Sequence, residues 1–95
     1  MKVFLSRRAQ KFLDAASPEL RARLEATISE LFTTPYPSGC KKLKGAPNAY
    51  RLRVGDYRIL YVIARRDEIV VFKVSPRESA YEYVRFETTR PDRAP

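Results

Sequence analysis

Two tight turns in close succession constrain the C-terminal half of this sequence more than any other feature. Gly55-Asp56 separates two segments that alternate between apolar and polar residues, and Arg66-Asp67, or the wider 65–68, separates the second segment from a third. Such short polar links are typical of turns that join adjacent antiparallel strands. The predicted strands cover residues 50–54, 57–64 and 68 or 69–75. Pro76 ends the third, because proline cannot donate to a strand ladder.

These turns also fix which side chains share a face, since residues alternate sides along a strand. They place Arg53 opposite Arg58, and Arg58 opposite Ser75. One predicted face is the core and carries Tyr50, Leu52, Val54, Tyr57, Ile59, Tyr61, Ile63, Val70, Phe72 and Val74. The other carries Arg51, Arg53, Arg58, Leu60, Val62, Val71, Lys73, Ser75 and, beyond the proline, Arg77.

Like charges meet on this second face. Arg53 opposite Arg58 costs roughly a few tenths of a kcal/mol, and no acidic residue of these strand segments shares the face. One arginine there could simply cover apolar surface with its stem. Several that converge through two hairpins predict a phosphate site instead. Lys41, Lys42 and Lys44 in the preceding segment would serve solubility or grip phosphates further along a nucleic acid.

The N-terminal half predicts a short apolar strand over residues 2–5 and two helices. Ser6 and Ser17 are the expected N-caps, and Pro18 follows the second at the first helical position. Apolar residues recur at helical spacing: Ala9, Phe12, Leu13 and Ala16 in a helix over 7–16, then Leu20, Leu24, Ile28, Leu31 and Phe32 in a second. The second helix is expected to end before Pro35.

These elements predict an α+β fold, with an N-terminal strand and a helical hairpin packed on a mainly antiparallel, four-stranded, twisted sheet. Residues 33–48 are rich in proline and glycine and are expected to be loop. Residues 77–86 are expected to form short helical turns. The single domain would span 1–86, and 87–95 would be a flexible tail.

The amino-acid composition limits which partners and which chemistry the protein can use. The 95 residues include 19 Lys and Arg against 11 Asp and Glu, a net charge of +8, which favours an anionic partner such as nucleic acid. The chain has no histidine, so acid–base chemistry would fall to Glu, Asp, Tyr or Lys, and we expect no metal or other cofactor. Cys40 is the single cysteine, and we find neither a secretion signal nor an apolar run of membrane length. We therefore expect a cytoplasmic protein.

Four features together resemble the RelE/ParE superfamily of bacterial type II toxin–antitoxin toxins: the two N-terminal helices, a loop ending KLKG, the hairpin YRLRVGDYRILY and the closing segment IVVFKVSPRESAY. The resemblance covers residues 2–84. Its most specific parts are GDYRILY and the spacing of Arg77 and Tyr81. The RelE-like branch, which we favour, implies a toxin that enters the ribosomal A site and cleaves mRNA, with a 2′-hydroxyl attacking the adjacent phosphate.

By motif position, the resemblance implies roles for Arg51, Arg53, Arg58, Arg77 and Tyr81. Our predicted catalytic set is Arg53, Arg58, Arg77 and Tyr81, together with Glu78 as a carboxylate able to act as a base. The arginines would stabilise charge that develops on the phosphate, and Tyr81 or Glu78 would take the proton. RNA and phosphate binding would fall to Arg51, Lys41, Lys42, Lys44, Lys73 and Tyr83, with Tyr83 an alternative to Tyr81. Arg51 and Arg53 stand where the branch often carries lysines, and arginine does not give up its proton.

Two other functions stay open at this point. The ParE-like branch shares the scaffold and inhibits DNA gyrase without nuclease activity, and a non-catalytic member would only bind RNA. Both toxin branches imply a cognate antitoxin. For a chain of net charge +8 we expect that partner to be acidic and partly disordered, folding as it binds.

Overall fold

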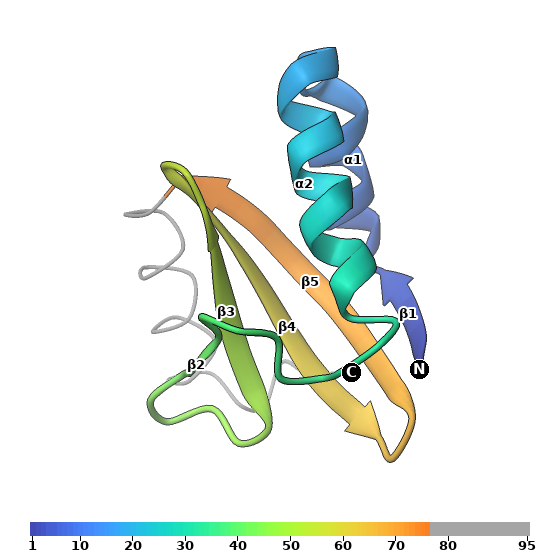
Figure 1. Ribbon diagram of the computed structural model, residues 1–95, viewed down its shortest axis with the longest axis vertical. Helices are drawn as coiled ribbons and strands as arrows, with labels where there is room; N and C mark the ends of the chain where they lie inside the picture. The colour runs from blue at the N-terminus through green and yellow to red at the C-terminus, as the bar shows by residue number, and fades with distance from the viewer. Residues whose placement is uncertain (77–95) are drawn as a thin grey trace.

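The computed structural model describes residues 1–76 of the chain. The elements are β1 (Lys2–Leu5), α1 (Arg7–Ala15), α2 (Pro18–Glu30), β2 (Lys41–Lys42), β3 (Ala49–Val54), β4 (Tyr57–Arg65) and β5 (Glu68–Pro76). The strands form one sheet in the order β1-β5-β4-β3-β2 (Figure 1). β1 is parallel to β5, and the other neighbours are antiparallel. The α+β prediction is confirmed, with five strands rather than four.

Both helices begin at the predicted caps. Ser6 Oγ accepts a hydrogen bond from the Ala9 amide at 3.1 Å, and Ser17 Oγ accepts one from the Leu20 amide at 3.2 Å. Because α2 ends at Glu30, Phe32 lies beyond it. Its side chain is 54% exposed, so the prediction that Phe32 completes the buried stripe is wrong.

The first hairpin has the predicted register, with Arg53 opposite Arg58 and Val54 opposite Tyr57. Gly55 has a φ of 59°, in the left-handed region that glycine enters without strain, whereas Asp56 is not among the described residues with positive φ. That combination is a type II′ turn, whose twist matches that of the flanking strands. This turn fixes the arginine pair.

The second hairpin departs from the prediction in its middle. Arg58 lies opposite Ser75 as expected, but the register shifts between Leu60 and Tyr61, and again between Ile63 and Arg65. The first shift leaves Phe72 as an extra residue in β5, and the second leaves Ala64 as an extra residue in β4. Between these two bulges Tyr61 opposes Val71 and Ile63 opposes Ile69.

The bulges exchange the faces of three β5 residues. Val71 belongs to the main core and is fully buried, although the sequence placed it with the arginines. Phe72 packs in a second cluster instead, and Val70 pairs with Val62. The assignments of Val70 and Phe72 to the core face and of Val71 to the arginine face are therefore wrong.

The segment after α2 is not loop throughout, because β2 pairs with β3 and places Lys41 opposite Arg51 and Lys42 opposite Tyr50. A buried aromatic side chain holds this segment to the sheet: the Tyr61 hydroxyl donates to the Pro35 carbonyl at 2.7 Å. Tyr50 stacks on the Tyr61 ring with centroids 5.8 Å apart. The two-residue strand corrects the prediction of a plain loop over 33–48.

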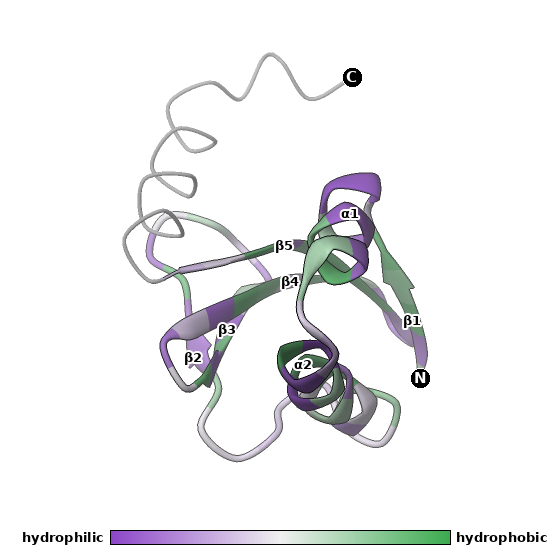
Figure 2. Cartoon of the chain, turned by 90° about the horizontal axis from the view of Figure 1, so that it is seen from above, coloured by the Kyte–Doolittle hydropathy of each residue, from purple (hydrophilic) through white to green (hydrophobic). Residues whose placement is uncertain are grey.

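The helices cover one face of the sheet. They lie side by side toward the β1 edge, while β2 lies at the opposite edge, away from both (Figures 1 and 2). The main core comprises Ala9, Leu13, Leu24, Ile28, Leu31, Leu52, Val54, Ile59, Tyr61, Ile69, Val71 and Val74. Within residues 1–76 neither helix has the length and apolar character needed to span a membrane. The predicted helical turns over 77–86 and the tail over 87–95 lie outside the described residues.

Candidate nucleic-acid interface

The face of the sheet turned away from the main core carries two rows of paired residues, since directly opposed residues share a side. One row crosses the four strands β2 to β5 as Lys41, Arg51, Leu60 and Lys73. The adjacent row consists of Arg53, Arg58 and Ser75. We call these seven residues the basic face. Figure 2 shows hydrophilic residues along β2 and the adjoining part of β3.

Arg58 is the unusual residue of this face. Its side chain is only 4% exposed, and its Nε and Nη1 atoms are buried without a hydrogen-bond partner among residues 1–76. The Ser75 hydroxyl opposite it is buried and unpaired in the same part of the chain. A guanidinium keeps its proton at physiological pH, and a buried charge without a partner costs several kcal/mol. An anion that accepted hydrogen bonds from these donors would remove that cost.

Neighbouring residues add to the positive potential at Arg58. Arg53 lies directly opposite it, and Lys41 lies opposite Arg51. Within strands β2 to β5 the single acidic residue is Glu68, at the far end of β5, where its carboxylate lies 3.6 Å from Arg65 Nε. The strands thus supply no carboxylate near the arginine pair. Like charges held this close favour binding of a polyanion.

A second apolar cluster lies on the same side of the sheet as the basic face. Its buried members are Leu43, Ala49 and Leu60, with Ala46 and Phe72 packed against them. Leu60 sits between Arg51 and Lys73 in the same row. Apolar groups at this place displace water from the neighbouring cations, and each electrostatic contact with a bound anion becomes stronger in such surroundings.

The pKa of Lys73 is shifted by its surroundings. Burial lowers the pKa of its ammonium group, and the nearby Arg8 guanidinium lowers that pKa further. Arg8 stands in the first turn of α1, which contains no acidic residue. The basic face therefore combines arginines, which stay charged, with a lysine whose pKa is lowered.

Residues 3–81 of the chain match the protein family described as the ParE toxin of type II toxin-antitoxin system, parDE. The chain belongs to this toxin family. The same span contains every element of the described structure from Val3 onward, so the match covers the fold and the basic face together.

Relatives of this toxin carry RelE names. Toxin RelE3 of Methanocaldococcus jannaschii is 33% identical over 87 residues, which is 87% of this chain and 98% of that protein. The match thus spans nearly the whole of a RelE protein, although the family description names ParE. Both names belong to the RelE/ParE superfamily predicted from the sequence.

Solved structures agree with this relationship. A RelB–RelE antitoxin–toxin complex from Methanococcus jannaschii contains a chain that is 30% identical to the toxin, covers 84% of it and 96% of itself, and superposes with a TM-score of 0.68. A RelE–RelB complex from Pyrococcus horikoshii OT3 gives 28% identity, coverage of 80% and 93%, and a TM-score of 0.69. The fold of the toxin is therefore that of RelE.

The structure brings together only some of the residues predicted for the site. Arg51, Arg53, Arg58, Lys41 and Lys73 share the basic face. Lys42 pairs with Tyr50 and so lies on the other side of the sheet, and Lys44 is exposed beyond β2. The remaining predicted residues, Arg77, Glu78, Tyr81 and Tyr83, lie outside the described part of the toxin.

Sequence reasoning missed Arg8 and Ser75 as parts of this site. Arg7 and Arg8 carry a usable signal, because acidic residues are the favoured ones in the first turn of a helix and this helix begins with two cations. Ser75 was placed on the correct face, but the burial of its hydroxyl, which has no partner among residues 1–76, depends on tertiary packing. No local sequence pattern predicts the burial of this hydroxyl.

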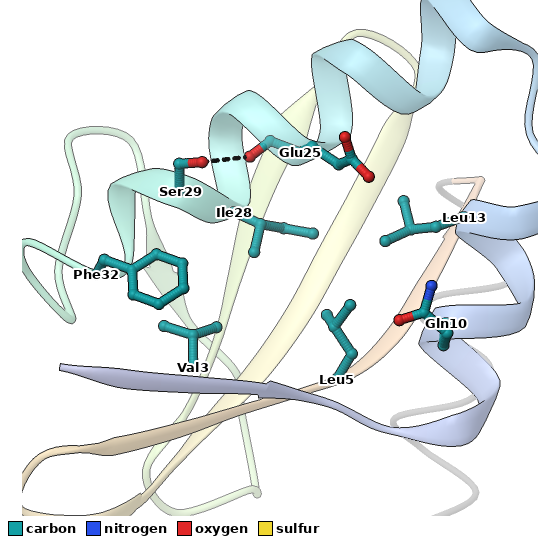
Figure 3. Close-up of a pocket in the computed structure, with 8 residues that line it drawn as sticks. All are labelled: Val3, Leu5, Gln10, Leu13, Glu25, Ile28, Ser29 and Phe32. Carbon is teal, nitrogen blue, oxygen red and sulfur yellow. Dashed lines mark hydrogen bonds between the residues drawn. The ribbon is translucent and has the colours of Figure 1, made fainter.

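The toxin also has a cavity on its helix side, well separated from the basic face. It has a volume of about 360 Å³ and is lined by Val3 and Leu5 of β1, Gln10 and Leu13 of α1, Glu25, Ile28 and Ser29 of α2, and Phe32 (Figure 3). Ser29 Oγ donates to the Glu25 backbone carbonyl at 2.8 Å. The lining combines apolar residues with Gln10, Ser29 and the acidic Glu25, and it contains no cationic side chain that would bind a phosphate.

Proposed function

We propose that the toxin is a ribosome-dependent endoribonuclease that cleaves mRNA and so inhibits translation in the cytoplasm. The observation that carries the proposal is the Arg58 side chain beside Arg53 and Ser75, because its buried Nε and Nη1 atoms have no hydrogen-bond partner among residues 1–76. A group of this kind destabilises the free protein, and it gains most from an anion that enters the site. The absence of histidine from the chain supports a mechanism without a metal.

The chemistry follows from where charge develops. When a 2′-oxygen attacks the adjacent phosphorus, negative charge grows on the phosphate oxygens and on the departing 5′-oxygen. Arg58 and Arg53 would stabilise that charge, and loss of one such donor typically costs about 100- to 1000-fold in rate. Arg51 and Lys41, one row away, would hold a neighbouring phosphate and keep the strand in line. Arg77 keeps the charge-stabilising role that the family resemblance implies, and Tyr81 and Glu78 are the candidates from the sequence for the proton transfer.

We also propose a cognate antitoxin as the physiological partner. Two solved RelE relatives are complexes with RelB antitoxins, and the net charge of +8 on the toxin suits an acidic chain. A partly disordered partner could fold over the surface and cover the basic face, with the ordering cost met by binding.

A ParE-like gyrase inhibitor is the second candidate function, because the family that matches residues 3–81 is described by the ParE name. The two candidates differ in what they damage. A gyrase inhibitor would leave mRNA intact and produce DNA breaks in cells that express it. An mRNA nuclease would leave DNA intact and cut transcripts in register with codons.

The test is primer extension on mRNA from a purified translation system to which the toxin is added. We expect codon-aligned cuts with the wild-type chain and about 100- to 1000-fold fewer with Arg58→Met. Arg65→Ala is the matched control, since Arg65 stands on the same strand but at its exposed, distant end. Equal cleavage by wild type and Arg58→Met would contradict the proposal, and intact mRNA with all three proteins would favour the gyrase candidate.

A further inference from the structure

We propose that Lys73 is a catalytic residue that accepts the proton of the attacking 2′-hydroxyl. This inference rests on the proposed nuclease function. It assigns the proton transfer to a residue within the sheet, in place of Tyr81 or Glu78.

Lys73 is well placed for that role. It lies opposite Leu60 on β4, in the row next to the Arg58–Ser75 pair. Diagonal neighbours across antiparallel strands are about 7–8 Å apart at the backbone, which is within the reach of long side chains. The ammonium nitrogen of Lys73 can therefore approach a phosphate held by Arg58 and contact the ribose beside it.

The bulge at Phe72 shapes this position. Because the register shifts there, Phe72 joins Leu60 in the second apolar cluster instead of entering the main core. Lys73 thus follows an aromatic residue that packs on its own side of the sheet, and it is only half-exposed. A lysine on a regular strand without this cluster would extend into water.

The charged groups around Lys73 come from several elements. Arg8 approaches from α1, Arg51 belongs to the same row on β3, and Arg58 lies in the next row on β4. On its own strand the acidic residue is Glu68, which sits at the other end beside Arg65. Burial and Arg8 both favour the neutral amine by lowering the pKa of Lys73.

No other basic residue on the described part of this face fits the task equally well. Arg51, Arg53 and Arg58 stay protonated and cannot act as bases. Lys41 is exposed on the two-residue edge strand, where water stabilises its charge. The arginines would also neutralise the bound phosphate, whose charge would otherwise raise the pKa of the lysine.

The step balances without any co-reactant. The neutral Lys73 amine takes the proton from the 2′-hydroxyl as the 2′-oxygen forms a bond to phosphorus. The bond from phosphorus to the 5′-oxygen breaks, and that oxygen takes a proton from water. The products are a 2′,3′-cyclic phosphate and a 5′-hydroxyl, and the Lys73 ammonium then returns its proton to the hydroxide left in solvent.

The experiment compares wild-type toxin with Lys73→Arg, which keeps the positive charge but cannot release a proton. Single-turnover cleavage of mRNA on ribosomes is measured from acid to alkaline pH. We expect Lys73→Arg to lose about 100-fold or more in rate at neutral pH, together with the rise in rate that wild type shows as Lys73 deprotonates. Binding of an RNA with a 2′-deoxy residue at the cleavage site should be unchanged. Lys11→Arg, on the outer surface of α1, is the matched control.

A second variant provides an independent readout. Arg8→Gln removes the guanidinium that lowers the Lys73 pKa, so the midpoint of the pH–rate profile should move to higher pH. If Lys73→Arg keeps the wild-type profile, or loses RNA binding along with cleavage, Lys73 is not the proton acceptor while the nuclease function stands. If the wild-type toxin itself leaves mRNA intact at every pH, both proposals fall.

Discussion

The two faces of the central sheet differ in how their buried polar groups are satisfied, although both are built from the same strands. On the helix side, side chains of β3, β4 and β5 pack against α1 and α2, and the hydroxyl of the buried Tyr61 is paired with Pro35. On the other side, Arg58 is as well buried as many core residues but has two unpaired nitrogens within the described part of the chain. The buried hydroxyl on the helix side has its partner within the chain, whereas we propose that a bound anion supplies the partners on the other side.

Along β4, the residues that stabilise the fold alternate with the residues that we propose for function. Ile59 and Tyr61 contribute to the core, and Arg58 and Leu60 alternate with them on the basic face. Burial of apolar area stabilises the first pair of residues. A buried charge without a partner works against folding, so we propose that Arg58 serves binding and not packing. Substitutions on the two faces should therefore affect different measurements.

The largest effect on stability is expected from the helix side. Leu24 is fully buried between α2 and the sheet, so Leu24→Ala should lower the free energy of unfolding by about 2–5 kcal/mol. Urea unfolding followed by circular dichroism measures the change. Cleavage per folded molecule should stay at the wild-type level. A loss below about 1 kcal/mol would show that this side is not the close-packed face described here.

A smaller effect is expected where the two faces meet. Ser6 Oγ accepts from the Ala9 amide and donates to the carbonyl of Phe72 at 3.1 Å, next to the bulge. Ser6→Ala should therefore cost about 1 kcal/mol, which corresponds to about 4–8 °C in melting temperature for a chain of this size. Ser17→Ala, whose capping hydroxyl contacts only its own helix in the described hydrogen bonds, is the comparison. An identical loss in both variants would show that the hydrogen bond from Ser6 to the Phe72 carbonyl adds no stability beyond that of the helix cap.

The smallest effect is expected at the edge of the basic face. Lys41 is exposed and lies one strand away from Arg51, so Lys41→Ala should reduce the slope of log binding constant against log salt by about 0.7 for single-stranded RNA. Its effect on the cleavage step itself should be slight. Binding of a non-cleavable RNA at several salt concentrations checks this. An unchanged slope would place Lys41 outside the binding surface.

Much of the fold could be predicted because local chemistry decides it. Ser6, Ser17 and Pro18 mark the helix starts, and Gly55 permits the turn that sets Arg53 opposite Arg58. The faces of β5 could not be predicted. An extra residue at Ala64 and another at Phe72 offset one another, so both ends of the hairpin keep the simple register while its middle shifts.

The candidate site shows the same limit. Its arginines could be identified from strand alternation, because Arg53 and Arg58 follow from one turn. The burial of Arg58 and the lowered pKa of Lys73 could not, since both depend on the second apolar cluster and on Arg8 from a distant helix. Charge alone suggested Lys42 and Lys44, and the pairing of β2 places Lys42 on the other side of the sheet. Their part in RNA binding stays a prediction.

The central claim is that Arg58 is kept for an anion at a cost to folding. Thermal unfolding of wild type and Arg58→Met, each with and without an RNA that has a 2′-deoxy residue at its cleavage site, tests it most directly. We predict that Arg58→Met alone is as stable as wild type or more stable, by up to about 4 kcal/mol, and that the RNA raises the melting temperature of wild type far more than that of the variant. A variant that is strongly destabilised, yet is stabilised by RNA as much as wild type, would contradict the account.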